Sequence, residues 1–430
     1  MKKVAVVVDF YSIDNAYSLC NVAGDQIRML LRAGYSPRVL VDDHFPDPKE
    51  KPDEVPYPWD SVELFRLPSI PRSNLLELPD NWQSHLERMT AAMREGLKGI
   101  DIAFTHDVVY QPAQILYLMA MREILKERAG SLRAAHLVHS ATAPALISTT
   151  NEYLQEVKKP LPYSVLCFPN AYSRPRLSRN FGYEEKDIRH TPHAIDFCSY
   201  FKFHPMTTRI VDEYNMLQSD VIICYPLRLD RGKNAEWVLY IAAGLKAIGR
   251  SVRVIIAAFH STGGDKVEYK KWLYEEAHRV GLSDDEFVFT CDYDEELRVR
   301  CPREMIADFF QLSNVFIMPS RSESFSLITL EAGLAGNLIV LNKDFPPLRF
   351  WGEQHIYGKF SSNIDAMTGF DGNTDVSYSP SKEAYARDLA LRIVAGLQNN
   401  VVIRTKTELR QRYNLDTIFS KYWEPIIYEA

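Results

Sequence analysis

Two glutamates, Glu323 and Glu331, stand eight positions apart directly after a short apolar run, and their carboxylates could bind the hydroxyls of a sugar or a ribose. The run Asn314–Met318 is bounded by Pro319 and has the character of a buried parallel strand. Residues 327–334 have helical character, which predicts Glu323 on a strand-to-helix loop and Glu331 inside the helix. The helix should begin near residues 324–326, where unpaired backbone N–H groups favour a polar or anionic ligand.

A second group of charged residues follows the predicted strand 221–225. Arg228 and Lys233 lie on the loop at the carboxyl end of that strand, and Asn234 could cap the apolar helix that follows. A guanidinium binds phosphate oxygens in a fork and an ammonium acts as a compact charge, so the pair suits a diphosphate that departs in a reaction. Arg231 fits no motif and is expected to be simply exposed.

The stretch from Pro319 to Gly336 and the Arg-Leu-x-x-x-Lys arrangement at 228–233 resemble motifs of glycosyltransferase family 4, retaining enzymes of GT-B fold. The resemblance implies that Glu323 contacts the transferred sugar and Glu331 the ribose of the donor nucleotide. The family usually has Glu-Gly-Phe-Gly where this chain has Glu-Ser-Phe-Ser, which keeps the backbone N–H groups but gives up the freedom of glycine. The implied donor-binding residues are Arg228, Lys233, Glu323, Ser324, Phe325, Ser326, Glu331 and, lining the base pocket, Thr290.

The first half of the chain offers a histidine at the end of the predicted strand 134–139. The family often has a histidine here near the reacting sugar, so the resemblance gives His139 a role in positioning the sugar. It thereby joins Glu323, Arg228 and Lys233 as a predicted catalytic residue. A packed structural histidine is an equally open interpretation.

Acceptor contacts are the least specified part of the prediction. Many relatives have paired glycines in the loop after the first strand, and this chain has none there. Asp9, Tyr11 and Asn15 on that loop, and His106 after a later strand, could hydrogen-bond an acceptor. An ordinary strand-end loop explains Asp9, Tyr11 and Asn15 nearly as well.

No metal or cofactor site is predicted, and the only small-molecule requirement is the nucleotide diphosphate sugar itself. Residues 292–296 are acidic but are interpreted as the solvated start of a helix. The six cysteines show no Cys-x-x-Cys pair and no interleaved histidines, so neither a disulfide framework nor a zinc site is expected. No Ser-His-Asp or Cys-His arrangement points to a hydrolase.

The chain has 430 residues and a hydrophobic content of 46%, enough for two cores. Apolar strands alternate with amphipathic helices from residue 4 to 168 and again from 221 to 341, interrupted by an expected loop at 43–59. The predicted fold class is α/β of GT-B type, with two Rossmann-like doubly wound domains that face each other across a cleft. We predict an acceptor-side domain at 1–197, a donor domain at 198–414, and a C-terminal helix at 415–430 that packs back on the first domain.

The predicted function is a metal-independent, retaining transfer of a sugar to a hydroxyl by a front-face mechanism. The acceptor could be a glycan, a lipid-linked molecule or a small molecule; a modified DNA base gains no support from a net charge of -6 and a pI of about 6.0. No run approaches the roughly 18 apolar residues of a membrane span, and a cytoplasmic location is expected. A UDP-sugar 2-epimerase-like enzyme and a non-catalytic nucleotide-sugar-binding protein remain alternatives. The base, the sugar, the acceptor and the oligomeric state stay open.

Overall fold

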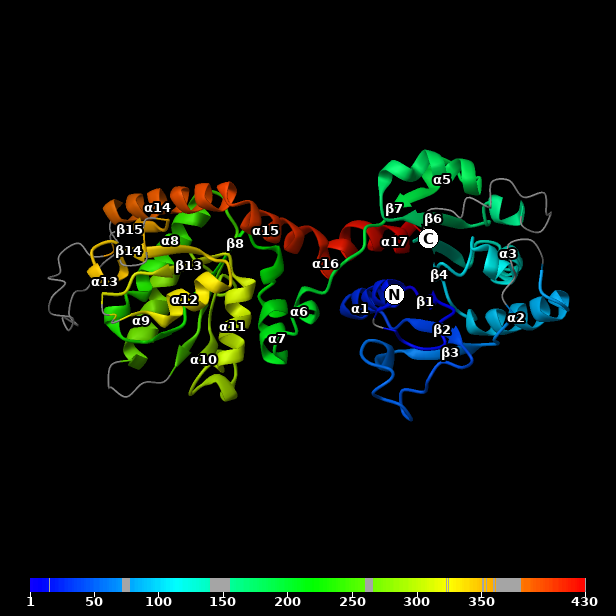
Figure 1. Cartoon of the computed structure of the whole chain (residues 1–430), viewed down its shortest axis with the longest axis horizontal. Coiled ribbons are helices and arrows are strands. Elements are labelled where there is room, and N and C mark those ends of the chain that lie inside the picture. The colour runs from blue at the N-terminus through cyan, green and yellow to red at the C-terminus, as the bar shows by residue number, and fades with distance from the viewer. Residues whose placement is uncertain are drawn as a thin grey trace. The chain divides into compact units, whose positions relative to one another are not determined.

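The structure is a computed structural model that describes residues 1–429 except 15, 72–77, 140–154, 260–265, 322, 324, 350–351, 353, 359 and 361–379 (Figure 1). The chain divides into two compact units. Unit 1 consists of Met1–Asp196 together with Tyr413–Ala430, and unit 2 consists of Phe197–Arg412. The last residues of the chain therefore belong to the same unit as the first.

Unit 1 is built on a seven-stranded, fully parallel sheet with the strand order β3-β2-β1-β4-β5-β6-β7. Its strands are β1 (Val4–Val7), β2 (Arg38–Asp42), β3 (Glu63–Leu67), β4 (Ile102–His106), β5 (Arg133–Leu137), β6 (Ser164–Phe168) and β7 (Ile188–His190). Its helices are α1 (Ser18–Arg32), α2 (Trp82–Gly96), α3 (Ile115–Arg128), α5 (Arg174–Phe181), α16 (Leu415–Ile418) and α17 (Glu424–Glu429), the last two joined by a π-helical segment (Phe419–Trp423).

Successive side chains of β1 enter different cores, as the period of two along a strand requires. Val4 and Val6 pack in one core with α1 and the C-terminal segment, whose Phe419 and Trp423 belong to the same cluster. Ala5 and Val7 pack in the other, with helices α2, α3 and α5. Helices thus cover both faces of the sheet, which explains why its central strands are apolar without alternation.

Unit 2 repeats this plan with a six-stranded parallel sheet in the order β12-β10-β8-β13-β14-β15, and a separate parallel pair of β9 and β11. Its strands are β8 (Val221–Cys224), β9 (Leu227–Arg228), β10 (Val252–Ile256), β11 (Ala258–Phe259), β12 (Phe287–Phe289), β13 (Val315–Met318), β14 (Leu338–Asn342) and β15 (Ile356–Gly358). Its helices are α6 (Phe197–Tyr200), α7 (Pro205–Glu213), α8 (Ala235–Ala247), α9 (Lys266–Arg279), α10 (Thr290–Tyr293), α11 (Arg303–Leu312), α12 (Leu327–Leu334), α13 (Pro346–Arg349) and α14 (Pro380–Asn399), followed by α15 (Val401–Tyr413), which runs to the unit boundary.

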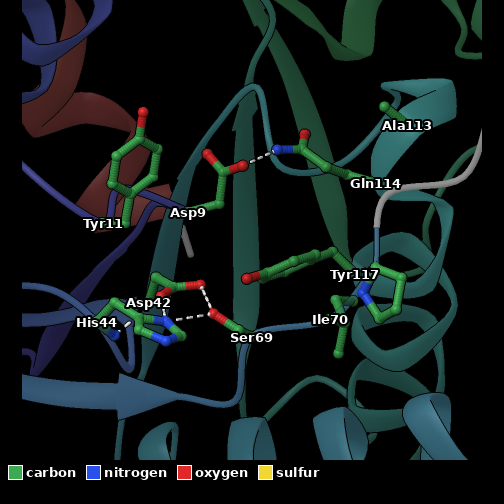
Figure 2. Close-up of a pocket in the computed structure, with 10 residues that line it drawn as sticks. Asp9, Tyr11, Asp42, His44, Ser69, Ile70, Ala113, Gln114 and Tyr117 are labelled. Atoms are coloured by element: carbon green, nitrogen blue, oxygen red, sulfur yellow. Dashed lines mark hydrogen bonds and ion pairs between the residues drawn. The ribbon is translucent and has the colours of Figure 1, made fainter.

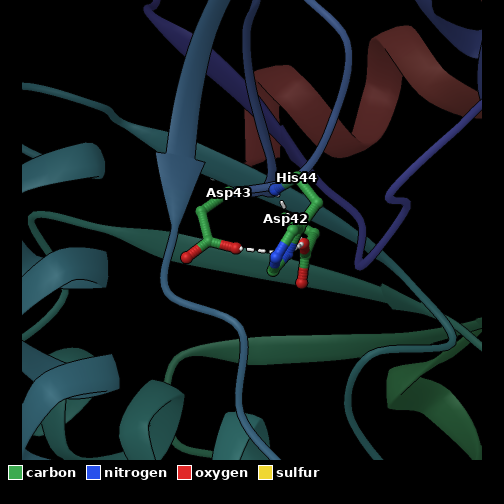
Figure 3. A group of neighbouring side chains, drawn as sticks. All are labelled: Asp42, Asp43 and His44. Carbon is green, nitrogen blue, oxygen red and sulfur yellow. Dashed lines mark hydrogen bonds and ion pairs between the residues drawn. The ribbon is translucent and has the colours of Figure 1, made fainter.

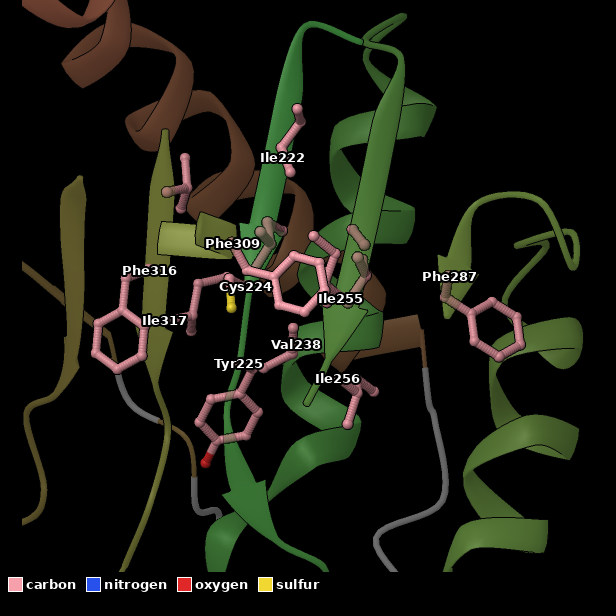
Figure 4. Packing of buried hydrophobic residues seen from close by; sticks show 14 of the residues in the cluster. Ile222, Cys224, Tyr225, Val238, Ile255, Ile256, Phe287, Phe309, Phe316 and Ile317 are labelled. Atoms are coloured by element: carbon pink, nitrogen blue, oxygen red, sulfur yellow. The ribbon is translucent and has the colours of Figure 1, made fainter. Parts of the chain in front are cut away.

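Strand β8 lies at the centre of the unit 2 core. All four of its residues are buried, so both of its faces are covered. Figure 4 shows Ile222 and Cys224 on this strand among side chains of β10, β13 and the helices, such as Ile255, Ile317 and Val238. A strand that is held on every side gives the loop at its carboxyl end a fixed starting point.

The α/β class and the doubly wound parallel sheets agree with the sequence prediction. The helix predicted over residues 327–334, with Glu331 inside it, is confirmed as α12, and the loop at 43–59 contains no helix or strand before Trp59. Elements of unit 1 that were not anticipated include α3, α5, and β7 within a segment expected to be only an interdomain passage. Among the described residues, no helix combines the length and the apolar character that crossing a membrane requires.

Candidate functional site

The loops that follow β8 and β13 are held to each other by hydrogen bonds. The side-chain amide of Asn234 donates to the carbonyl of Pro319 (2.9 Å), and the backbone N–H of Arg321 donates to the carbonyl of Gly232 (2.9 Å). Asn234 adopts a left-handed conformation and its side chain does not cap α8, so the predicted cap is wrong. Its amide instead links the loops that follow two neighbouring strands, and this link constrains the shape of the site.

Lys233 and Glu323, predicted separately from two motifs, form an ion pair. The Nζ atom of Lys233 lies 2.5 Å from Oε1 of Glu323, and the two side chains are 22% and 16% exposed. The hydroxyl of Tyr225, itself buried, donates to the carbonyl of Lys233 (2.7 Å) and fixes the backbone beneath the cation. The structure therefore brings an ammonium group against a carboxylate at the carboxyl ends of adjacent strands.

Glu331 lies inside α12, eight residues after Glu323, and meets a cation of its own. Its Oε1 atom is 3.0 Å from a guanidinium nitrogen of Arg303, which begins α11 and is 86% exposed. Arg303 carried no motif in the sequence, and only the proximity of α11 and α12 in the fold indicates it. Glu323 is thus mostly buried and Glu331 is partly exposed, and each carboxylate contacts one positive side chain.

Ser326 precedes α12 in the left-handed region, with φ of 65°. This conformation favours glycine. The buried hydroxyl of the serine forms a hydrogen bond with that of Thr329 (2.8 Å). Phe325 is half exposed. Ser324 lies outside the described residues.

The remaining donor-side predictions have different surroundings. Arg228 ends β9 with its side chain exposed, and it forms no ion pair with the described residues. Thr290 begins α10, after β12, and is completely buried. A side chain with no exposed surface contacts a nucleotide base only if its surroundings open, so Thr290 is placed as a packing residue in this structure.

A buried acidic group next to this site was missed from the sequence. Glu236, in the first turn of α8, is 5% exposed and accepts a hydrogen bond from the hydroxyl of Tyr269 (2.6 Å). Burial raises the pKa of Glu236, while that hydrogen bond and the charges of Arg321 and Arg231 oppose the shift. Arg231 is not simply exposed as predicted, because its guanidinium packs over the rings of Tyr269 (5.1 Å) and Trp272 (5.8 Å).

In unit 1, three histidines stack at the carboxyl ends of the strands. The rings of His106 and His139 are parallel within 8°, with centroids 5.2 Å apart, and the ring of His193 lies 5.1 Å from that of His139 between centroids. Burial lowers the pKa of His139 to about 3, and the nearby His193 adds to the effect. The imidazole of His139 is therefore neutral at physiological pH and is suited to hydrogen bonding, not to carrying charge.

Hydrogen bonds fix which nitrogen of His139 accepts. The Nε2–H group of His106 donates a hydrogen bond to the side-chain oxygen of Gln26 (2.6 Å). In this tautomer Nδ1 of His106 carries no proton and accepts a hydrogen bond from Nε2 of His139 (3.1 Å). This leaves Nδ1 of His139 as an acceptor, and it has no partner among the described residues. Sequence reasoning found His106 and His139 but assigned His106 to the acceptor, whereas His106 is completely buried and holds His139 instead.

The predicted acceptor residues Asp9 and Tyr11 border two adjoining cavities of about 450 and 640 Å³ in unit 1. Figure 2 shows the smaller one, where the amide of Gln114 donates to the carboxylate of Asp9 and Tyr117 faces the same space. Tyr11 is 65% exposed at the rim. Asn15 lies outside the described residues. No sequence motif indicated Gln114 or Tyr117 as residues of this region.

Asp42, Asp43 and His44 are the one group of described side chains whose potential ligand atoms lie close enough to hold a metal ion, within 4.8 Å of each other (Figure 3). Nδ1 of His44 lies 2.9 Å from Asp42 and 2.8 Å from Asp43, and Asp42 also accepts a hydrogen bond from Ser69. These contacts satisfy the three groups internally. All six cysteines are free.

The chain matches no protein-family model, and no curated protein matches it. Solved structures to which it is similar include a glycosyltransferase from Rickettsia africae ESF-5, with 12% identity, coverage of 100% of this chain and 98% of that chain, and a TM-score of 0.34. Another is HepE from Anabaena in complex with UDP-glucose, with 13% identity, full coverage of both chains and a TM-score of 0.36. A third is sucrose-phosphate synthase from Thermosynechococcus elongatus, with 15% identity, coverage of 100% and 98%, and a TM-score of 0.35.

Proposed function

We propose that this chain is a retaining glycosyltransferase that moves a sugar from a nucleotide diphosphate sugar to a hydroxyl acceptor. The contact between Lys233 and Glu323 carries the proposal, because it unites a cation for the diphosphate with a carboxylate for the sugar. Both lie on loops at the carboxyl ends of parallel strands, where doubly wound sheets bind their ligands. In this proposal unit 2 takes the donor and unit 1 takes the acceptor.

The donor breaks at the bond between its anomeric carbon and the diphosphate oxygen, and that electron pair stays on the diphosphate. Lys233 and Arg228 stabilise the negative charge that grows there. The acceptor oxygen forms the new bond on the same face of the sugar, and its proton passes to a phosphate oxygen. No nucleophile of the protein is required, which fits the front-face route and retention of configuration.

The two glutamates orient the donor. Glu323 accepts hydrogen bonds from sugar hydroxyls, and Glu331 accepts them from the ribose. Without a ligand, Glu323 contacts Lys233 and Glu331 contacts Arg303. In this proposal the phosphate oxygens and the nucleotide compete with the two glutamates for these cations. Donor binding would therefore exchange internal ion pairs for ligand contacts, and part of the binding free energy offsets that exchange.

His139 is proposed to position the sugar through Nδ1, a buried atom with no partner among the described residues, so this contact requires the surroundings of His139 to open. A neutral imidazole that accepts one hydrogen bond fits this role better than proton transfer, because the pKa near 3 keeps it unprotonated. We further propose that the reaction needs no metal ion and that the protein acts in the cytoplasm, where six free thiols stay reduced.

The proposal is tested first by donor binding and then by transfer. Thermal shifts with UDP, GDP, ADP and dTDP identify the base, since a ligand of the folded state raises the melting temperature. UDP and UDP-glucose are convenient first probes. Nucleotide sugars are then incubated with a panel of hydroxyl acceptors, and proton NMR of the product reads whether the anomeric configuration is retained.

Three substitutions connect this activity to the site. Arg228→Ala should slow transfer, whereas Arg300→Ala, a matched exposed arginine outside the site, should not. Glu331→Ala should weaken nucleotide binding, and Glu323→Ala should abolish most transfer while the nucleotide still binds. Conversion of the donor without an acceptor would favour an epimerase, and nucleotide binding without any donor cleavage would favour a binding protein.

A further inference from the structure

The two cavities in unit 1 adjoin each other, and we treat them as one region. They share Asp9, Tyr11, Ala113 and Gln114, and together they run from the carboxyl end of β1 to the segments that follow β2, β3 and β4. Their volumes of about 450 and 640 Å³ are those of ordinary small-molecule sites. Figure 2 shows the side chains of Asp9, Tyr11 and Tyr117 around the smaller one.

The charged side chains that line this region are nearly all acidic. Asp9 borders both cavities, Asp42 borders the smaller one, and Asp14 and Asp107 border the larger one. No lysine or arginine is among the described residues that line either cavity. Among the described lining residues, the one side chain that can become positive is His44, which already contacts Asp42 and its neighbour Asp43.

This charge distribution selects against anions. A phosphate or carboxylate placed here would face several carboxylates without a counter-charge, and like charges brought together at an interface are strongly unfavourable. Burial raises the pKa of Asp107 and the charge of Asp9 adds to the rise, while hydrogen bonds from the backbone of His139 and from Gln111 oppose it. An ammonium group would instead relieve the repulsion between the carboxylates.

The hydrogen-bonding groups complement a polyol. Ionised carboxylates only accept hydrogen bonds, so they call for donors such as hydroxyl and ammonium groups. Gln114 adds an amide that already orients Asp9. The rings of Tyr11 and Tyr17, each more than half exposed, offer apolar faces at the rim of the larger cavity.

We propose that this region is the acceptor site and that it takes a polyhydroxylated acceptor without phosphate or carboxylate groups, favouring one that carries an amino group. The inference rests on the proposed function, because only that function makes the ligand an acceptor. The chemical class of the ligand is argued from unit 1 alone. Sugar phosphates are accordingly excluded as acceptors, whichever sugar the donor supplies.

Matched probes test this on the full chain without any donor: D-glucose, D-glucosamine and D-glucose 6-phosphate, titrated and followed by NMR. EDTA is present so that no divalent cation at Asp42, Asp43 and His44 can bridge a phosphate. We expect glucosamine to bind more tightly than glucose and glucose 6-phosphate to bind about tenfold more weakly than glucose. The preference for glucosamine should shrink as salt is added.

Asp42→Asn should reduce the discrimination between glucosamine and glucose 6-phosphate, while Asp53→Asn, an exposed aspartate outside the region, should leave it unchanged. Asp14→Asn, at the exposed rim, serves as the second variant if Asp42→Asn does not fold. The inference is overturned if glucose 6-phosphate binds as tightly as glucose, if none of the three probes binds, or if neither lining variant changes the order. Because nucleotide binding is measured separately, its failure would remove the proposed function and leave these results interpretable.

Discussion

Acidification should destabilise unit 1 more than unit 2, because unit 1 encloses histidines that the folded state keeps neutral. Burial lowers the pKa of His136 and of His139 to about 3, and holds that of His106 well below its ordinary value. In the unfolded chain each would titrate near its ordinary pKa of about 6.5. Between these values the unfolded state binds more protons, so the free energy of unfolding falls as the pH falls.

The magnitude follows from the unfolded-state pKa alone once the folded-state pKa lies far below the working pH. Lowering the pH from 8 to 5.5 should remove about 1.4 kcal/mol for each such histidine, or about 4 kcal/mol for His106, His136 and His139 together. Asp25 works against this, since burial raises its pKa to about 6. A carboxyl with a raised pKa gains stability on acidification, here about 0.8 kcal/mol. The net loss is then about 3 kcal/mol.

Hydrogen exchange followed by mass spectrometry measures this loss for each unit separately. After correction for the intrinsic pH dependence of exchange, the slowest amides of β4 and β5 should lose about 3 kcal/mol of protection between pH 8 and 5.5. Those of β8 and β13 in unit 2 serve as the internal reference. An unchanged difference between the two units would refute the reasoning.

A single substitution isolates the contribution of one histidine to this pH dependence. His139→Gln should reduce the pH-dependent loss in unit 1 by about 1.4 kcal/mol, whatever it does to stability at pH 8. His278→Gln is the matched control, since that imidazole is half exposed in unit 2. Equal pH dependence in the His139 variant and the original chain would show that this histidine titrates alike in both states.

The other predictions concern unit 2 and the reaction. Ser326→Gly should be more stable to urea than Ser326→Ala by about 1 kcal/mol, because glycine alone adopts φ of 65° without strain; the reverse order would contradict the assigned backbone. Gly244→Ala should lower stability by about 1–3 kcal/mol, since the new Cβ would lie 2.7 Å from the carbonyl of Ala386, and an unaltered melting temperature would argue against this close packing. A double-mutant cycle of Lys233→Met and Glu323→Gln should give a coupling of about 1 kcal/mol in urea unfolding, and zero coupling would mean that the ion pair is absent. EDTA should leave the transfer rate unchanged, and a loss that added divalent metal restores would reject a metal-independent reaction.

Local patterns were sufficient for much of the fold. The apolar run before Pro319 located β13, because burial on both faces of a strand leaves a direct mark on residue type. The helical pattern after it located α12, although burial does not account for its leucines: Thr329 and Ala332 are buried, whereas Leu327, Leu330 and Leu334 are exposed. Helix α3 escaped because its first residues are buried nearly all round, so no polar stripe reveals the helical period. Strand β7 is only three residues long, too short for a periodic signal.

For the site, the sequence by itself determined which residues carry charge and on which strand-end loops they stand, as for Lys233 and Glu323. Only the tertiary structure decided that these two side chains meet, that Arg303 contacts Glu331, and that His106 serves to hold His139. The physical reason is that the order of strands in a sheet is not determined by residues that are close in the sequence. Residues 90 positions apart become neighbours only because β8 and β13 pair in the sheet, and no short-range pattern of residues encodes that pairing.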